Sequence, residues 1–259
     1  MPMKHRARRP ASPGREVLYG VHPVTEALIA NRRRIDALLI DRKVPSERQG
    51  RIVSLAEARG IAVEYLAPED LRQASGSDQH QGVAMRVSSL PLDDLESLDL
   101  TGTGGCLLVI LDSIVDPHNL GAIVRTAHCV GADGLVVPKD RAAGATPAVS
   151  KASAGALEHT RFCQVTNLAA TMAGLKKKGV WIAGLAMQAS QTLFQADLKG
   201  PLALVVGGEE KGLRPRVRQQ CDFLLSIPLR GRVDSLNAST AAAVVLYEAL
   251  RQRMNEGTG

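Results

Sequence analysis

Aromatic residues are scarce in this sequence: Phe, Trp and Tyr together make up 3% of 259 residues. Proteins that hold single-stranded nucleic acid commonly stack its bases on aromatic side chains. A stacking platform of that kind is therefore not expected here. If RNA is the partner, the contacts should go mainly to phosphate and ribose, with the bases recognised by polar groups.

Cysteine is also rare, and Cys106, Cys129, Cys163 and Cys221 are far apart, with no C-x-x-C pair. This spacing indicates reduced thiols of a cytoplasmic protein, and neither a disulfide framework nor a zinc site. The acidic residues show no metal-ligand spacing, so we expect no metal. No apolar run reaches the roughly 18–20 residues of a membrane span, and the basic N-terminus lacks the apolar segment of a secretory signal. We therefore expect neither membrane insertion nor secretion.

Positive charge is in excess, with a formal net charge of +6, and residues 1–15 carry five basic residues and no acid. We expect a disordered basic tail over 1–15, suited to attracting a polyanion. Other basic residues cluster at 32–34, 176–178, 214–218 and 230–232. Each of these clusters, taken alone, is more simply interpreted as a solvated surface.

The N-terminal third alternates between strand and helix patterns and predicts a small α/β domain over 16–88. Residues 89–105 mix turn formers, acids and glycines, and we expect a linker there, flexible at its glycine end. The predicted strands are 16–19, 37–41, 61–65 and 83–87, and the predicted helices are 22–31, 46–59 and 68–73.

The remaining residues, 106–259, predict a second α/β domain. Residues 106–111 and 202–206 are continuous apolar runs, as expected of strands buried on both faces of a parallel sheet. Open sheets of this kind bind ligands at the carboxyl ends of their strands. Further strands are predicted at 135–137, 161–165, 180–185 and 223–227, and helices at 120–130, 147–156, 168–178 and 237–254.

Polar residues follow three of these strands. After 106–111 come Asn119, expected to cap the next helix, and Arg125, just off the buried stripe of that helix. Arg125 could point toward the strand ends, or it could be an ordinary surface arginine.

After 202–206 comes a glycine-rich turn containing Gly207, Gly208, Glu209 and Gly212. Its spacing matches neither the dinucleotide fingerprint nor a phosphate-binding loop. The acidic residue favours a cationic or hydroxyl-bearing ligand over a phosphate, although the stretch could also be a plain turn at a strand end.

The third stretch runs from Ile227 to Thr240, through a turn at Gly231. Ser235, Asn237 and Ser239 crowd the first turn of the following helix, where backbone N–H groups need acceptors. These residues could therefore be functional, or they could simply cap the helix.

Taken together, the three stretches resemble the three motifs of the SpoU (TrmH-type) RNA ribose 2′-O-methyltransferases. The N-terminal unit, which closes with residues 80–84, is similar to the substrate-binding domain of the bacterial branch that methylates a guanosine of large-subunit ribosomal RNA. Arg230, Arg232 and Asp234 depart from the family pattern, as do Ala238 and Thr240, and this bears on the exact RNA target.

The resemblance implies a SPOUT-type α/β domain with a deep trefoil knot, S-adenosylmethionine (SAM) as methyl donor, ribosomal RNA as substrate, and a homodimer whose active site uses both subunits. Main-chain groups of Gly207, Ile227 and Leu236 would hold the cofactor. The catalytic residues implied by the resemblance are Arg125, Asn119, Glu209, Ser235 and Asn237.

Arg125 could act on the ribose hydroxyl in two ways. It could be a general base, but a guanidinium with a pKa above about 12 rarely releases its proton. It could instead grip the neighbouring phosphate and lower the pKa of the hydroxyl. Asn119 and Glu209 would hydrogen-bond to substrate or to Arg125.

Other functions stay open at this point. The same fold could serve a transfer-RNA ribose methyltransferase or a ribosomal enzyme of the antibiotic-resistance type. A non-catalytic RNA-binding assembly factor is a second class. A dinucleotide-dependent enzyme is disfavoured because the fingerprint is absent.

Overall fold

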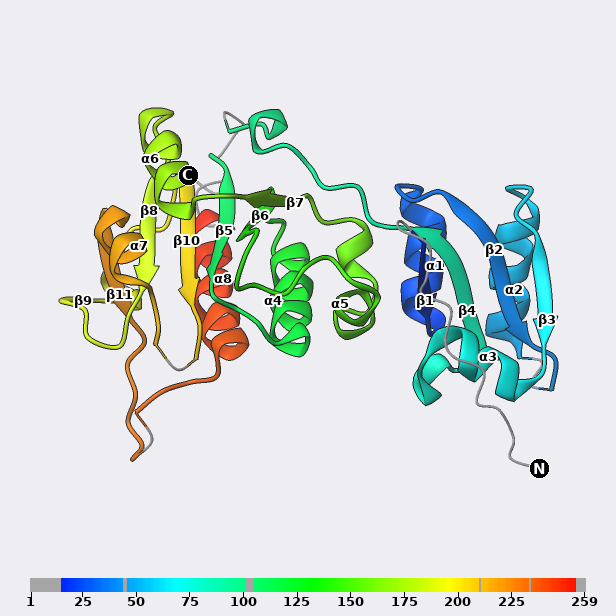
Figure 1. Ribbon diagram of the computed structural model, residues 1–259. Coiled ribbons are helices and arrows are strands. Elements are labelled where there is room, and N and C mark those ends of the chain that lie inside the picture. The colour runs from blue at the N-terminus through cyan, green and yellow to red at the C-terminus, as the bar shows by residue number, and fades with distance from the viewer. Residues whose placement is uncertain (1–14, 44–45, 101–104, 210, 233, 255–259) are drawn as a thin grey trace, which may run out of the picture. The chain divides into compact units, whose positions relative to one another are not determined.

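The computed structural model describes residues 15–43, 46–100, 105–209, 211–232 and 234–254. It divides into two compact units, residues 1–90 and 91–259 (Figure 1). Of the predicted basic tail, only Arg15 lies within the described residues, where it begins the first strand and pairs with Asp36 at 3.3 Å.

The N-terminal unit is a four-stranded mixed sheet in the order β1-β4-β2-β3. β4 pairs antiparallel with both β1 and β2, and β2 pairs parallel with β3. The strands are β1 (Arg15–Tyr19), β2 (Ile35–Asp41), β3 (Val63–Leu66) and β4 (Val83–Ser88), and the helices are α1 (Val21–Ala30), α2 (Glu47–Glu57), α3 (Pro68–Ser75) and the 3₁₀ turn η1 (Asp78–His80).

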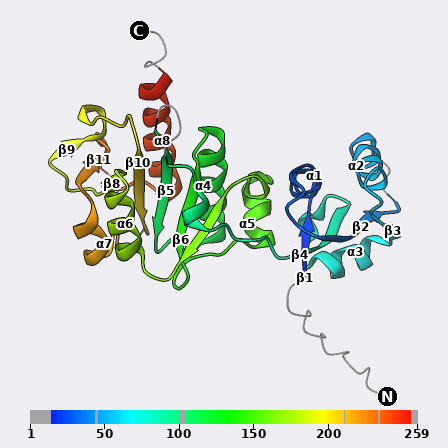
Figure 2. The same cartoon turned by 90° about the horizontal axis from the view of Figure 1, so that it is seen from above.

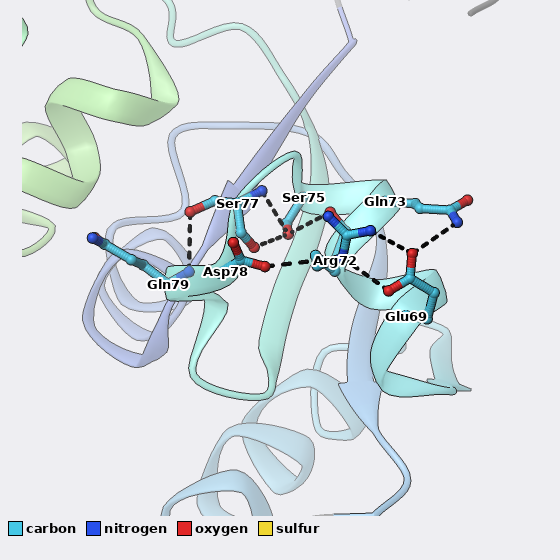
Figure 3. Close-up of polar contacts among 7 residues, drawn as sticks. All are labelled: Glu69, Arg72, Gln73, Ser75, Ser77, Asp78 and Gln79. Carbon is cyan, nitrogen blue, oxygen red and sulfur yellow. Dashed lines mark hydrogen bonds and ion pairs between the residues drawn. The ribbon is translucent and has the colours of Figure 1, made fainter.

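Polar side chains gather at the end of α3 (Figure 3). Arg72 donates to both oxygens of Glu69, at 2.5 and 2.9 Å, and lies 3.9 Å from Asp78. The hydrogen bond from Arg72 lowers the pKa of Glu69 to about 2. An arginine held between two carboxylates has little charge left for a phosphate, so this turn is a poor anion site.

The C-terminal unit is a seven-stranded sheet in the order β7-β6-β5-β10-β8-β11-β9, and all of its pairs are parallel. The strands are β5 (Leu107–Asp112), β6 (Gly134–Pro138), β7 (Phe162–Val165), β8 (Trp181–Leu185), β9 (Gln191–Thr192), β10 (Leu202–Gly207) and β11 (Phe223–Ser226). The helices are α4 (Pro117–Cys129), α5 (Pro147–Ala152), α6 (Leu168–Lys177), α7 (Pro215–Gln220) and α8 (Ala238–Met254), with 3₁₀ turns η2 (Leu95–Ser97), η3 (Ala156–Glu158) and η4 (Leu193–Gln195).

Helices cover both faces of this sheet: α4 and α8 lie on one side, and α6 and α7 on the other (Figure 2). Every residue of β5 is buried. Leu108 and Ile110 join the core cluster that contains Met172 and Leu175 of α6. This two-sided burial is the reason for the continuous apolar runs in the sequence. Within the described residues, no helix is long and apolar enough to cross a membrane.

The segment expected to be a linker is packed on the C-terminal unit over much of its length. Asp93 forms an isolated parallel β-bridge with Cys163, and its carboxylate accepts a hydrogen bond from the backbone N–H of Phe162 at 2.8 Å. Leu98 is buried in the main core cluster. Residues 101–104 lie outside the described part of the chain.

Two expected helix boundaries were wrong. Asn119 does not cap α4: the helix begins at Pro117, and the cap is Asp116, whose carboxylate accepts from the N–H of His118 at 3.0 Å. Proline suits the first helical position because its φ is already helical and it lacks an N–H to satisfy. The helix expected over 147–156 ends at Ala152, because Ala154 adopts a left-handed φ of 52°. β9 and α7 were not predicted.

Candidate active site

A cavity of about 810 Å³ opens at the carboxyl ends of β8, β10 and β11. Its wall is formed by residues 185–188, 206–213 without 210, and parts of 225–241. Gly207, Ile227 and Leu236, which the sequence pattern grouped as cofactor residues, all lie in this wall. The volume falls within the roughly 300–1,000 Å³ typical of small-molecule sites.

The glycines after β10 are needed because backbone packs against backbone. A Cβ at Gly207 would lie 2.3 Å from the carbonyl carbon of Gly212, and one at Gly208 would lie 2.6 Å from the carbonyl oxygen of Ser113. Gly212 has a left-handed φ of 59°. The loop therefore folds tightly on itself, and glycine is required at these positions by the close approach of backbone to backbone.

Three side chains from the three motifs meet in one hydrogen-bonded cluster. The amide nitrogen of Asn119, in α4, donates to Oε1 of Glu209 at 2.5 Å. The amide nitrogen of Asn237, just before α8, donates to the same Oε1 at 2.6 Å and to the amide oxygen of Asn119 at 2.9 Å. Glu209 also lines the cavity, so the cluster lies at its edge.

Asn237 caps α8 as well as joining the cluster. Its amide oxygen accepts from the N–H of Ser239 at 2.9 Å and from that of Thr240 at 3.3 Å. The cap leaves the amide nitrogen facing Glu209 and Asn119. The capping and functional interpretations of this stretch are thus compatible, because one side chain serves both through opposite ends.

Arg125 is not brought to this cluster within its own chain. It lies six residues after Asn119 in α4, about 9 Å further along the axis and on another side of the helix. Its side chain is exposed, lies outside the cavity wall, and has no ion pair or side-chain hydrogen bond to the described residues. Within the described residues of this single chain, Glu209 hydrogen-bonds to the two asparagines and not to Arg125; its alternative expected partner is the substrate.

The charged side chains around the cavity are mixed in sign. Lys211, Arg218 and Arg232 line it together with Glu209 and Asp234, and Ser235 is exposed in the same wall. Such a rim does not resemble a phosphate cradle. Among the described residues, no group of three or more His, Cys, Asp or Glu side chains could hold a metal ion.

Two of the three lysines in the 176–178 cluster are already paired. Lys176 contacts Asp222 at 2.6 Å and Lys178 contacts Glu96 at 2.8 Å. These pairs reduce the charge that the 176–178 cluster offers to a polyanion.

Family models identify the class of both units. The model of the SpoU rRNA Methylase family matches residues 106–247, and that for RNA 2′-O ribose methyltransferase substrate binding matches residues 17–92. The chain therefore belongs to the SpoU rRNA methylase family.

Individual relatives narrow the comparison. The chain is 44% identical to the 23S rRNA (guanosine-2′-O-)-methyltransferase RlmB of Shewanella oneidensis, over 92% of this chain and 98% of the relative. It is 42% identical to RlmB of Ralstonia nicotianae over 92% and 96%. The Bacillus subtilis protein YacO, named a putative TrmH family tRNA/rRNA methyltransferase, is 40% identical over 92% and 96%.

Solved structures agree with the fold. The SpoU methyltransferase AviRb of Streptomyces viridochromogenes, in complex with AdoMet, superimposes with a TM-score of 0.80 at 28% identity, covering 93% of this chain and 91% of that one. The A. aeolicus TrmH/SpoU tRNA modifying enzyme superimposes with a TM-score of 0.54 at 30% identity, over 58% of this chain and 77% of that one.

Proposed function

We propose that this protein transfers a methyl group from SAM to the ribose 2′-hydroxyl of a guanosine in 23S ribosomal RNA. The RlmB relatives support the substrate, since they match nearly end to end. The observation that carries the proposal is the Asn119–Glu209–Asn237 cluster at the edge of the cavity. In this cluster, side chains from three motifs that are far apart in the sequence meet beside the cavity, which supports a chemical role for them.

The cavity fits the proposed methyl donor. Leu185, Leu229 and Leu236 offer apolar contact to an adenine, and the acid-and-base rim suits a ligand that carries both charges. Main-chain groups of Gly207, Ile227 and Leu236 would hold the adenosyl part. When bound, SAM supplies an electrophilic methyl carbon on a positively charged sulfur.

The chain's own residues would prepare the ribose hydroxyl. Both amide donors of the cluster go to Oε1 of Glu209, and Oε2 has no partner among the described residues. Oε2 would accept a hydrogen bond from the 2′-hydroxyl and aim its oxygen at the methyl carbon. Ser235, in the cavity wall, would contact the nucleotide.

Arg125 requires a second subunit in this proposal. It is exposed and has no partner for its guanidinium in the described part of its own chain. A homodimer would bring Arg125 of one copy to the cavity of the other, where it would bind the phosphate beside the target ribose. A cation there lowers the pKa of the hydroxyl without having to lose its own proton.

Two further features belong to the same proposal. The described residues between β11 and α8, 227–232 and 234–237, contribute to the cavity wall that residues 207–209 and 211–213 also line. This arrangement is compatible with the trefoil knot that the family resemblance implies. Ribosomal RNA as substrate also implies a cytoplasmic location.

The substrate-binding unit favours ribosomal over transfer RNA. Its family model matches residues 17–92, whereas the tRNA modifying neighbour aligns with only 58% of the chain. A map of ribose methylation in cells with and without the protein would test this. Loss of one 23S guanosine mark is expected. Loss of a methyl group from transfer RNA, or from another ribosomal position, would show that the proposed substrate is wrong.

Catalysis itself can be tested against a purely scaffolding role. Calorimetric titration with S-adenosylhomocysteine should show one site per chain. Absence of binding by the intact protein, together with an unchanged methylation map, would favour a non-catalytic RNA-binding factor.

A further inference from the structure

Asp112 is a completely buried carboxylate at the carboxyl end of β5. It does not line the cavity. Its Oδ2 accepts from the backbone N–H of Arg214 at 2.7 Å, and its Oδ1 accepts from Nε of the same arginine at 2.5 Å. The hydroxyl of Ser113 adds a longer hydrogen bond at 3.3 Å. A buried charge needs such partners, because an unpaired one is strongly destabilising.

The main chain of Asp112 holds the other end of the same loop. β10 lies beside β5 (Figure 1), with Gly207 opposite Asp112, and the carbonyl of Asp112 accepts from the N–H of Gly208 at 2.9 Å. One residue thus holds position 208 through its backbone and position 214 through its side chain. Between these points, the N–H of Gly212 donates to the carbonyl of Gly208 at 2.9 Å.

This loop carries the groups on which the proposed reaction depends. Gly207, Gly208, Gly212 and Leu213 line the cavity, and Glu209 joins it to the asparagine cluster. Arg214 follows directly and is the N-cap residue of α7. A change at Asp112 or Arg214 would therefore reach the cavity through the loop, without touching a ligand.

We infer that the Asp112–Arg214 ion pair is a positioning device that holds residues 207–209 and 211–213 in the form that binds the methyl donor. The inference rests on the proposed function for the identity of that ligand. Both residues would raise the affinity for the cofactor without contacting it, since neither lines the cavity.

Three substitutions would separate this role from general stability. Asp112→Asn keeps the shape and one acceptor oxygen, but it removes the negative charge, and its amide nitrogen cannot accept the second of the two bonds from Arg214. Arg214→Lys keeps the charge and the backbone N–H and loses the guanidinium donor. Asp133→Asn is the matched control: this exposed carboxylate accepts from the N–H of Leu107 at 2.7 Å, at the opposite end of β5.

The experiment measures the Kd for S-adenosylhomocysteine by calorimetry and the hydrogen exchange of backbone amides in the full-length chain. Asp112→Asn should weaken binding by about tenfold or more, since a displacement of about 1 Å can cost about a hundredfold. Amides 208–214, which follow β10, should exchange faster while those of β5 and β10 stay protected. In turnover assays the KM for SAM should rise and the KM for RNA should not. Arg214→Lys should fall between Asp112→Asn and the wild type, and Asp133→Asn should bind within twofold of the wild type.

Wild-type affinity and unchanged loop exchange in Asp112→Asn would overturn the inference. If that variant does not fold, Arg214→Lys decides, and wild-type binding and exchange there would overturn it equally. If the wild-type protein does not bind S-adenosylhomocysteine at all, the proposed function fails. Faster exchange confined to amides 208–214 in Asp112→Asn would still show that the pair holds the loop.

Discussion

Replacing Gly207 with alanine tests whether the backbone of the glycine loop forms the cofactor site. The added Cβ would lie 2.3 Å from the carbonyl carbon of Gly212, 2.5 Å from its oxygen and 2.6 Å from the N of Leu213. All three are backbone atoms, so no side chain can swing away. Because ordinary contact begins at 3.4 Å, the Gly212–Leu213 segment would have to retreat by about 1 Å.

Such a displacement has two consequences. Overpacking of this kind typically costs about 1–3 kcal/mol of folding free energy. Both segments line the cavity, so the Kd for S-adenosylhomocysteine should rise by about 10- to 100-fold, or about 1.4–2.7 kcal/mol of binding free energy. Calorimetric titration and denaturant unfolding would measure these two quantities.

Gly174→Ala provides the matched control. Gly174 lies in α6, its φ is not positive, and nothing lies within 4 Å of its added Cβ. Alanine is the better helix former, so this variant should gain up to about 1 kcal/mol of stability and bind as the wild type does. Wild-type affinity in a folded Gly207→Ala protein would refute the reasoning, because the methyl group would then have been accommodated without disturbing the site.

Four further predictions follow from particular side chains. Asn237→Asp keeps the oxygen that caps α8 but places a second carboxylate against Glu209. Its methylation activity should fall by about a hundredfold or more with little change in Tm, whereas Asn237→Ala should lower both activity and Tm. Arg125→Lys should be nearly as inactive as Arg125→Ala in single-turnover methylation, and near-full activity would exclude both roles considered for it. The pKa of Glu248 is lowered to about 2 by hydrogen bonds from Arg251 and Gln252. The ionised carboxylate therefore stabilises the folded protein above pH 4.5, and this contribution is lost as the pH falls toward 2. In Glu248→Gln, the Tm should fall less steeply between these pH values. Burial raises the pKa of Cys221 to about 11, so mass spectrometry after alkylation at pH 8 should find the exposed Cys129 modified well before it.

Local patterns in the sequence were sufficient for most of the secondary structure. β5 and β10 are buried on both faces, and their sequences are therefore continuous apolar runs. The sequences of α4 and α8 show helical periodicity. Both patterns depend only on the surroundings of a short segment, so they can be recognised from the sequence. The boundaries that failed depended on local competition. Asp116 and Pro117 outcompete Asn119 for the start of α4, and a left-handed Ala154 ends the predicted helix early.

The sequence alone also contained the three motifs that identify the family, and with them the residue types proposed for the chemistry. That these residues meet in space was decided only by the tertiary structure. Asn119 lies 90 positions from Glu209 and 118 from Asn237, and no periodicity specifies that β10 inserts beside β5. The same strand pairing joins Asp112 to Arg214 across 102 positions, a contact with no sequence signal. Folding also left Arg125 outside the cluster, because a helix fixes the side to which each residue points and the pattern of motifs does not.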